Sequence, residues 1–221
     1  MRRIVSFFSL IILSHFAFSQ DFQPSVNDLV EETQRSTGDA DKLRLVWWVP
    51  VEFWEVSLAS DPSMTKEQLT EFIDVLDDYT MIGVIEGTVG PFGGITYESR
   101  NAIKEELTIT STMGTVLRPL DDDDINPDAQ NLLDMLKPIF SNMLGNMGEN
   151  LQMMLFEGYE SGLDRVADPK KEGVFKVQVF EETLEWKLPL GSLMPPKTCP
   201  VDGQLLNGAW LYCPWHGKKL E

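Results

Sequence analysis

The chain has 221 residues, of which 43% are hydrophobic, so it can bury one sizeable core and carry a small appendage. Its 18 Lys and Arg against 35 Asp and Glu give a formal net charge of −17 at pH 7. Binding to nucleic acid or to anionic lipid requires clustered cations that neutralise phosphates. The charge therefore argues against both as partners.

The N-terminus has the pattern of a secretory signal peptide. Two arginines precede the apolar run 4–18, and Ala17-Phe18-Ser19 is a small-x-small cleavage site before Gln20. We therefore predict a signal peptide at residues 1–19 and an exported protein, periplasmic or extracellular. The apolar run is shorter than the ~20 residues of a membrane span, so we expect no integral membrane segment after cleavage. Retention of the run as an uncleaved anchor is the alternative.

Cleavage would also change the charge and the set of reactive side chains. It removes two arginines, which takes the net charge from −17 to −19, and it removes His15, which leaves His216 as the only histidine. Cys199 and Cys213 are the only cysteines. The chain before them therefore cannot hold a Ser-His-Asp or Cys-His catalytic site, or a metal site made of several histidines.

Residues 20–42 are polar and are predicted to form a linker or flexible arm. An α+β domain is expected at residues 43–190, with helix starts at Thr65, Ser99 and Asn126 marked by capping residues. Strands and helices do not alternate regularly, so we expect a mostly antiparallel sheet with two or three packed helices. The expected strands are 43–49, 79–86, 95–97, 107–112 and 151–156, and the expected helices are 50–59, 66–78, 99–106 and 127–144.

A β-hairpin is expected near residues 175–188. Apolar and polar side chains alternate on both sides of Glu181-Glu182, where we place the turn. With this turn every inward residue faces an inward residue. The predicted pairs are Val179 with Leu184, Val177 with Trp186, and Phe175 with Leu188.

Glu52 and Glu55 lie among three tryptophans, Trp47, Trp48 and Trp54. Two carboxyls beside aromatic rings could serve a carbohydrate hydrolase, in which they flank the glycosidic bond. Aromatic residues at this density more often form core, however, and glutamates three residues apart on a helix are typical of a solvated face. We prefer core and solvated face, and we keep an extracytoplasmic hydrolase with paired carboxylates as the alternative function.

Three other segments have the composition of a site but are better explained by structure. The glycine-rich segment 87–94 contains Pro91 and leads into a strand, which favours a hairpin loop over a phosphate loop. The run Asp121–Asp124 lacks the spacing of a calcium loop and precedes a helix N-terminus, where the helix dipole favours negative charge. The methionines between residues 135 and 154 have helical spacing, which indicates adaptable core rather than a copper(I) site.

The C-terminal residues contain one motif twice. The first copy is Cys199-Pro-Val-Asp202-Gly203 and the second is Cys213-Pro-Trp-His216-Gly217. The proline-containing segment 189–196 precedes them and is a natural boundary, so residues 197–221 are expected to form a small module. Cys, Asp and His are all ligand types of zinc.

Residues 197–221 resemble a zinc ribbon, a family in which two Cys-Pro-x-Cys-Gly knuckles at hairpin tips supply four ligands to one Zn²⁺. The resemblance implies a degenerate zinc-ribbon hairpin module. Cys199 and Cys213 match the first ligand of each knuckle, and Asp202 and His216 replace the second. It further implies zinc as the cofactor, and a structural or contact role rather than catalysis.

A Cys199–Cys213 disulfide is the alternative to the metal, because export usually oxidises paired cysteines. Asp202 and His216 favour the metal, since a disulfide gives no reason for either. The rest of the chain resembles only uncharacterised exported bacterial proteins with a Trp-Trp-x-Pro run, here residues 47–50, which implies no activity. We therefore expect an exported non-catalytic binding or structural protein whose partner is a protein or a small molecule.

Overall fold

The computed structural model describes residues 22–220 except residues 40 and 60. The predicted signal peptide, residues 1–19, lies outside this part of the chain. Within the described part, no helix has both the length and the apolar character that crossing a membrane requires.

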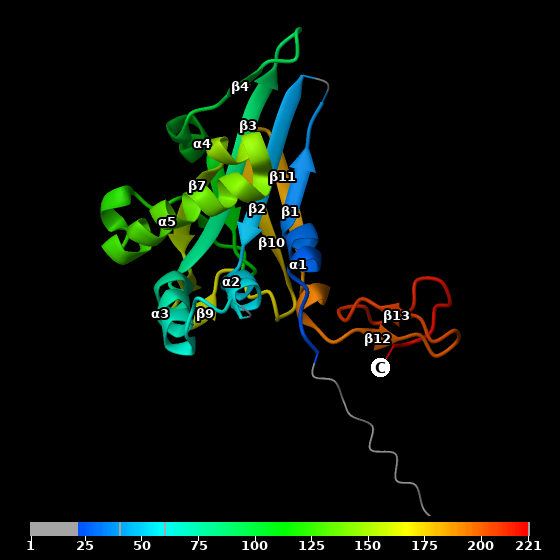
Figure 1. Ribbon diagram of the computed structural model, residues 1–221. Helices are drawn as coiled ribbons and strands as arrows, with labels where there is room; N and C mark the ends of the chain where they lie inside the picture. Colours follow the sequence, from blue (N-terminus) through cyan, green and yellow to red (C-terminus); the bar gives the residue numbers. More distant parts are fainter. Residues whose placement is uncertain (1–21, 40, 60, 221) are drawn as a thin grey trace, which may run out of the picture.

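Two antiparallel sheets form the centre of the molecule (Figure 1). The first has the order β1 (Gln34–Thr37), β2 (Lys42–Val49), β3 (Tyr79–Val89), β4 (Ile95–Tyr97), and β7 (Gln152–Glu157) also pairs with β3. The second has the order β11 (Glu182–Leu188), β10 (Gly173–Val179), β5 (Leu107–Thr110), β6 (Val116–Leu117). Antiparallel pairing throughout both sheets, together with helices, confirms the predicted α+β class.

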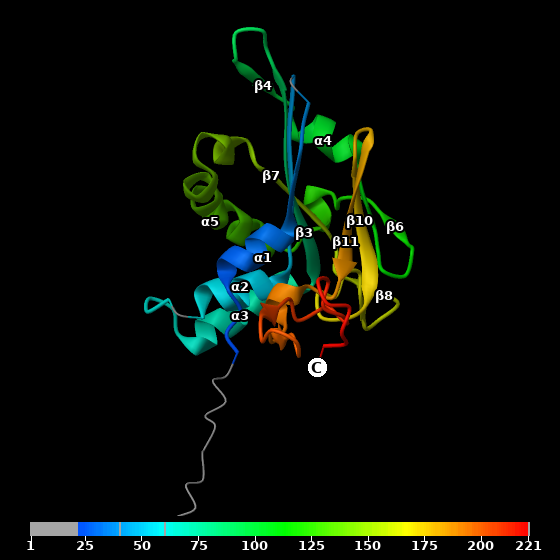
Figure 2. The same ribbon diagram turned by 90° about the vertical axis from the view of Figure 1, so that its right-hand side faces the viewer.

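Helices cover one face of the first sheet, and the second sheet covers the other (Figure 2). The covering helices are α1 (Val26–Thr33), α2 (Val51–Leu58), α3 (Lys66–Asp77) and α5 (Pro127–Leu144), whereas α4 (Arg100–Glu106) leads into β5. The predicted caps are confirmed at Thr65, Ser99 and Asn126. The connections contain the 3₁₀ helices η1 (Asp122–Asp124), η2 (Gly145–Asn150) and η3 (Gly191–Leu193), and the short strands β8 (Tyr159–Glu160) and β9 (Asp164–Arg165).

Two adjacent tryptophans of β2 connect the three layers. Trp47 packs edge-on against Phe53 of α2, with ring centroids 5.3 Å apart. Trp48 packs against Phe175 and Trp186 of the second sheet, at 5.0 and 6.3 Å. Successive residues of a strand point to opposite faces, so the pair fills the core on both sides of a central strand. The core interpretation of these aromatic residues is confirmed.

The linker prediction is wrong for residues 26–37. These residues form α1 and β1, and β1 pairs with β2. Leu29 is fully buried, and the hydroxyl of Thr33 accepts a hydrogen bond of 3.0 Å from the indole nitrogen of Trp47. Only a few side chains of this segment point into the core, and most of its remaining side chains are polar. Its composition therefore resembled that of a linker.

The hairpin of β10 and β11 is confirmed, but its predicted register is wrong by two residues. Phe175 pairs with Trp186 rather than with Leu188, and the turn lies at Phe180 and Glu181. Phe180 has a φ of 49°, and in turns this conformation is usually adopted by glycine or asparagine. Because the residue here is phenylalanine, the sequence contained no signal for the position of the turn. A shift of two residues keeps every side chain on its face, because side chains alternate with a period of two.

Glu32 of α1 attaches the C-terminal part of the chain to the body. Its carboxylate accepts hydrogen bonds from the backbone N–H of Gly191 (3.1 Å), from the N–H and hydroxyl of Ser192 (2.8 and 2.5 Å), and from the side-chain amide of Asn207 (3.1 Å). Gly191 and Ser192 belong to η3, and Asn207 follows the strand β13 (Leu205–Leu206). One carboxylate therefore holds both the segment that precedes the C-terminal module and Asn207 within the module.

Replacing Glu32 by Ala should loosen this attachment. We expect the lost charge-assisted hydrogen bonds to lower the free energy of unfolding by about 1–3 kcal/mol and to expose residues 191–198 to proteases. Urea denaturation measures the first effect, and limited proteolysis with mass spectrometry measures the second. Glu31→Ala is the matched control, because Glu31 is exposed on the same helix. Equal cleavage rates for the two variants would contradict the role of Glu32.

Candidate metal centre

The C-terminal module contains two turns of the same form, residues 199–203 and 213–217. β12 (Lys197–Thr198) pairs with β13 around the first turn, and a bridge between Tyr212 and Lys219 flanks the second. In each turn the glycine N–H donates to the cysteine carbonyl oxygen, at 2.9 Å in the first and 2.8 Å in the second. The glycines have φ values of 74° and 60°, which explains why glycine ends both motifs.

The two turns share a small apolar core, separate from that of the body. Cys199, Leu206, Cys213 and Leu220 are buried together in it. Four side chains bury too little apolar surface to order some twenty residues, whose conformational entropy opposes folding at ~1–2 kcal/mol each. A module of this size therefore needs a metal or a covalent bond to be stable by itself.

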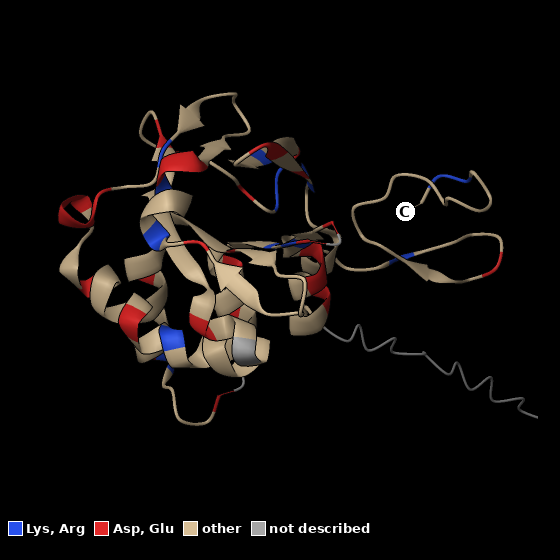
Figure 3. Ribbon diagram, turned by 90° about the horizontal axis from the view of Figure 1, so that it is seen from above, with Lys and Arg blue, Asp and Glu red and all other residues tan. Residues whose placement is uncertain are grey.

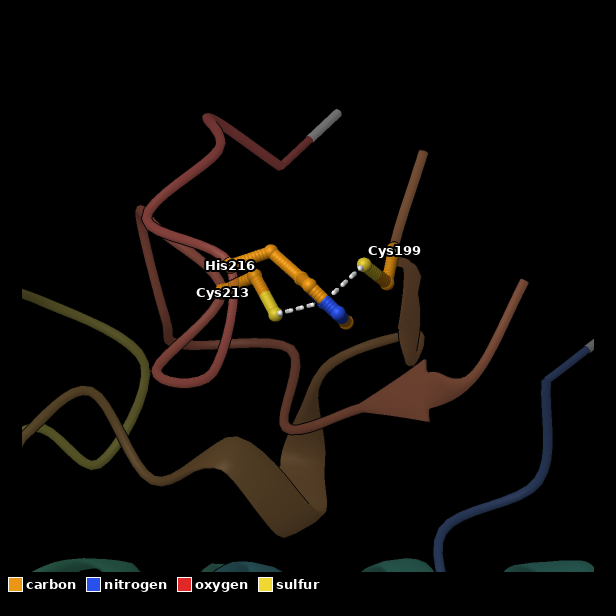
Figure 4. A group of neighbouring side chains, drawn as sticks. All are labelled: Cys199, Cys213 and His216. Carbon is orange, nitrogen blue, oxygen red and sulfur yellow. Dashed lines mark hydrogen bonds between the residues drawn. The ribbon is translucent and has the colours of Figure 1, made fainter. Parts of the chain in front are cut away.

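Three potential ligand atoms converge between the turns (Figure 4). Nδ1 of His216 lies 3.4 Å from Sγ of Cys199 and 3.5 Å from Sγ of Cys213. All three atoms lie within 4.8 Å of one another, and no other group of three or more His, Cys, Asp or Glu in the described part of the chain meets this criterion. Two sulfurs and an imidazole nitrogen at this separation could hold a metal ion.

Asp202 borders this group without being part of it. Its Oδ2 lies 3.8 Å from Nδ1 of His216, and its Oδ1 accepts a hydrogen bond of 3.1 Å from the backbone N–H of Gln204. The structure thus brings together three of the four predicted ligands and places the fourth beside the same ring nitrogen.

The two thiols have different electrostatic surroundings. Burial raises the pKa of Cys199, although the backbone N–H groups of Asp202 and Val201 donate to its sulfur and oppose the rise. Burial also acts to raise the pKa of Cys213, but hydrogen bonds from the N–H groups of His216 and Trp215 and from the imidazole outweigh it and lower the pKa. Each turn therefore points two N–H groups at its sulfur, an arrangement that stabilises the thiolate form that metals bind.

Both cysteines are free thiols in the structure. In a disulfide the sulfurs would have to approach to about 2 Å. The ring nitrogen of His216 lies close to both sulfurs (Figure 4).

Glu52 and Glu55 of α2 do not share a solvated face, and that prediction is wrong for Glu52. Glu55 is exposed, but Glu52 is only 3% exposed, and its Oε1 accepts a hydrogen bond of 2.7 Å from Arg165. Lys170 lies 3.7 Å from Glu52 and 3.9 Å from Glu55. Arg165 is 113 residues from Glu52 along the chain, so no local pattern could have indicated the contact.

The other site-like segments follow the preferred interpretations only in part, because the predicted core position of the methionines is wrong for Met135 and Met143 of α5, which are exposed. Residues 87–89 are the end of β3, and residues 90–94 join it to β4 in an antiparallel hairpin. Asp121 and Asp122 form ion pairs with Lys104 (2.8 Å) and Arg100 (3.0 Å). Among the methionines, those of β7 are buried and Met135 of α5 is exposed, so these side chains do not converge.

Comparisons of the chain with protein-family models, with curated proteins and with solved structures found no match.

Proposed function

We propose that residues 197–220 bind one structural Zn²⁺ through Cys199, Asp202, Cys213 and His216. We further propose that the chain is an exported, non-catalytic binding or structural protein, periplasmic or extracellular. The observation that carries the metal site is the approach of two sulfurs and one ring nitrogen to within 4.8 Å, from equivalent positions of two matching turns. Such a set arises by chance less readily than a group of exposed carboxylates.

The donor types favour zinc over other ions. Thiolate and imidazole ligands suit Zn²⁺, which prefers four ligands in a tetrahedron, whereas Mg²⁺ and Ca²⁺ require oxygen. Two sulfurs, one nitrogen and one carboxylate oxygen satisfy that number and leave no open position for a reacting water. A closed set supports a structural role.

The position of Asp202 supports a ligand role for its carboxylate. A carboxylate that only orients a metal-bound histidine contacts the ring nitrogen on the side away from the metal. Asp202 instead lies beside Nδ1, the same nitrogen that approaches both sulfurs. A small shift of this carboxylate toward the two sulfurs would make it the fourth donor of the proposed site.

The body of the protein supports binding or structure more than catalysis. The hydrolase alternative requires two free carboxyls beside exposed aromatic rings. Glu52 is instead engaged by Arg165, and Trp47, Trp48 and Trp54 are buried. Export is supported by the N-terminal sequence pattern and by the strongly acidic composition, which suits a soluble extracytoplasmic protein.

Metal analysis combined with thiol counting tests the site. We expect the protein, exported by a host and purified without reductant, to contain one equivalent of zinc, with two thiols that react only after chelation or denaturation. Chelation should make residues 197–220 sensitive to proteases, and added zinc should reverse this, because metal binding supplies the folding free energy of small modules. Absence of metal together with absence of reactive thiols in denatured protein would establish the disulfide instead.

A further inference from the structure

The C-terminal module exposes an apolar and cationic surface. Trp215 is 63% exposed, and its ring lies 6.2 Å from that of Trp210. Exposed aromatic clusters on a soluble protein commonly mark an interaction site. We call this set the tail surface: Trp210, Leu211, Tyr212, Trp215, Lys218 and Lys219, all of them exposed.

A second apolar surface lies between α3 and α5. A groove of about 360 Å³ runs between these helices, with Phe72, Val75 and Leu132 among its lining residues. Met135, which is 69% exposed, also lines it. Exposed methionine adapts its shape to large partner side chains, because it is flexible and polarizable. We call this feature the α3–α5 groove.

The two surfaces carry opposite charges. The groove is bordered by Glu71 and Asp128, whereas the tail surface ends in Lys218 and Lys219. Within residues 22–220 none of these four side chains belongs to an ion pair, so their charges are available to a partner. Acidic and basic residues both occur on the body (Figure 3), whereas residues 197–220 contain three lysines and one acidic residue.

The two surfaces of one molecule lie apart. Figure 1 shows α3 and α5 on one side of the body, and the C-terminal module projecting from the other side. Hydrogen bonds between Glu32 and η3 and between Glu32 and Asn207 fix the module in this position. The tail surface of a molecule therefore does not reach its own α3–α5 groove.

We infer that the tail surface of one copy of this chain binds in the α3–α5 groove of a second copy. Indole rings fill the apolar groove, and Lys218 and Lys219 lie against Glu71 and Asp128. This contact joins two different surfaces, so it leaves one free tail surface and one free groove in each pair. It therefore produces closed rings or open chains, and the fraction of associated molecules increases with protein concentration.

Sedimentation velocity of the zinc-containing exported protein over a range of concentrations tests this contact. The natural protein should associate, whereas Trp215→Ser on the tail surface and Met135→Glu in the groove should each weaken association at least tenfold. An equimolar mixture of the two variants should form dimers and nothing larger, because each pair then has one intact tail surface and one intact groove. Glu71→Lys, at the exposed rim, is a second groove variant with the same expected result.

Phe92→Ser is the matched control. Phe92 is 99% exposed in the β3–β4 loop, outside both surfaces, so its replacement should leave association unchanged. Zinc content measured for each variant verifies that the module is intact. A natural protein that remains monomeric, or a mixture of variants that does not form dimers, would overturn the inference. Co-sedimentation with phosphatidylcholine vesicles that depends on Trp215 but not on Met135 would overturn it in favour of a lipid surface.

Discussion

Replacing Cys199 by Ser is expected to abolish zinc binding and to unfold residues 197–220 while the body stays folded. Structural zinc contributes roughly 10–16 kcal/mol of apparent binding free energy in small modules. The apolar core of this module has only four members, Cys199 among them, so little else stabilises it. The body has its own core, which includes Trp47 and Trp48, and does not depend on the module. Zinc content and limited proteolysis measure the first effect, and urea denaturation of the body measures the second.

The variants of the other proposed ligands separate zinc from a disulfide. Cys199→Ser would remove either one, so it cannot distinguish them. His216→Ala and Asp202→Ala should lower zinc affinity at least tenfold and destabilise the module, whereas a disulfide would be insensitive to both changes. Val201→Ser is the matched control, because Val201 is exposed in the first turn and its side chain supplies no ligand atom. Unchanged zinc content in both His216→Ala and Asp202→Ala would refute the proposed site.

Replacing Arg44 by Met should lower the free energy of unfolding of the body by about 3–5 kcal/mol. Arg44 is buried on β2, and its Nε and Nη2 donate to the two carboxylate oxygens of buried Glu86, at 2.5 and 2.8 Å. Its Nη1 also lies 3.1 Å from Glu182 at the start of β11, so one guanidinium joins the two sheets. Without it, the carboxylate of Glu86 would be buried without a counter-charge, which accounts for most of the expected loss.

Lys42→Met is the matched control for Arg44→Met. Lys42 lies on the same strand and pairs with Glu181, but both side chains are largely exposed. An exposed pair contributes about 0–1 kcal/mol, so the control should change the free energy of unfolding little. Urea denaturation of both variants, followed by fluorescence of the buried tryptophans, measures the difference. Equal losses would show that the Arg44 network is not the connection between the sheets.

Acidification tests the same network without a mutation. The hydroxyl of Thr37 donates to Glu182 and lowers the pKa of that carboxyl below its ordinary value of 4.5; burial opposes the shift and Arg44 adds to it. A carboxyl whose pKa is lower in the folded state stabilises the fold above its unfolded pKa, and this stabilisation is lost as the pH falls through the folded pKa. The hydrogen bond from Thr37 is present in both proteins, whereas the contribution of Arg44 is absent from Arg44→Met, so the difference in stability between the two proteins should shrink below pH 4.5.

Much of the secondary structure could be predicted because its signals are local. The capping box at Thr65, the cap and proline at Asn126 and Pro127, and the alternation of β10 and β11 each involve only neighbouring residues. The two turns of the candidate metal centre could likewise be predicted from neighbouring residues. Their glycines adopt the positive φ values for which glycine is suited, so the spacing of the motif already contained the turn.

The errors concern contacts between distant parts of the chain. α1 and β1 are ordered by contacts with β2, which their polar composition does not reveal. The hairpin register depends on a turn at Phe180 that has no glycine, and Arg44 lies 5.7 Å from the Phe180 ring across the sheets. Glu52 is buried because Arg165, far along the chain, reaches it.

The sequence by itself determined the α+β class, the positions of most helices and strands, and the two matching turns, because propensity, capping and periodicity act between near neighbours. Only the tertiary structure decided which of four candidate ligands converge. Cys199, Cys213 and His216 meet because two hairpin tips face each other, and Asp202 remains beside them because the Gln204 N–H holds its other oxygen. The spacing of residues along the chain determines each turn. The approach of the two turns instead depends on the apolar core that they share, which forms only when its side chains are buried together in the folded module.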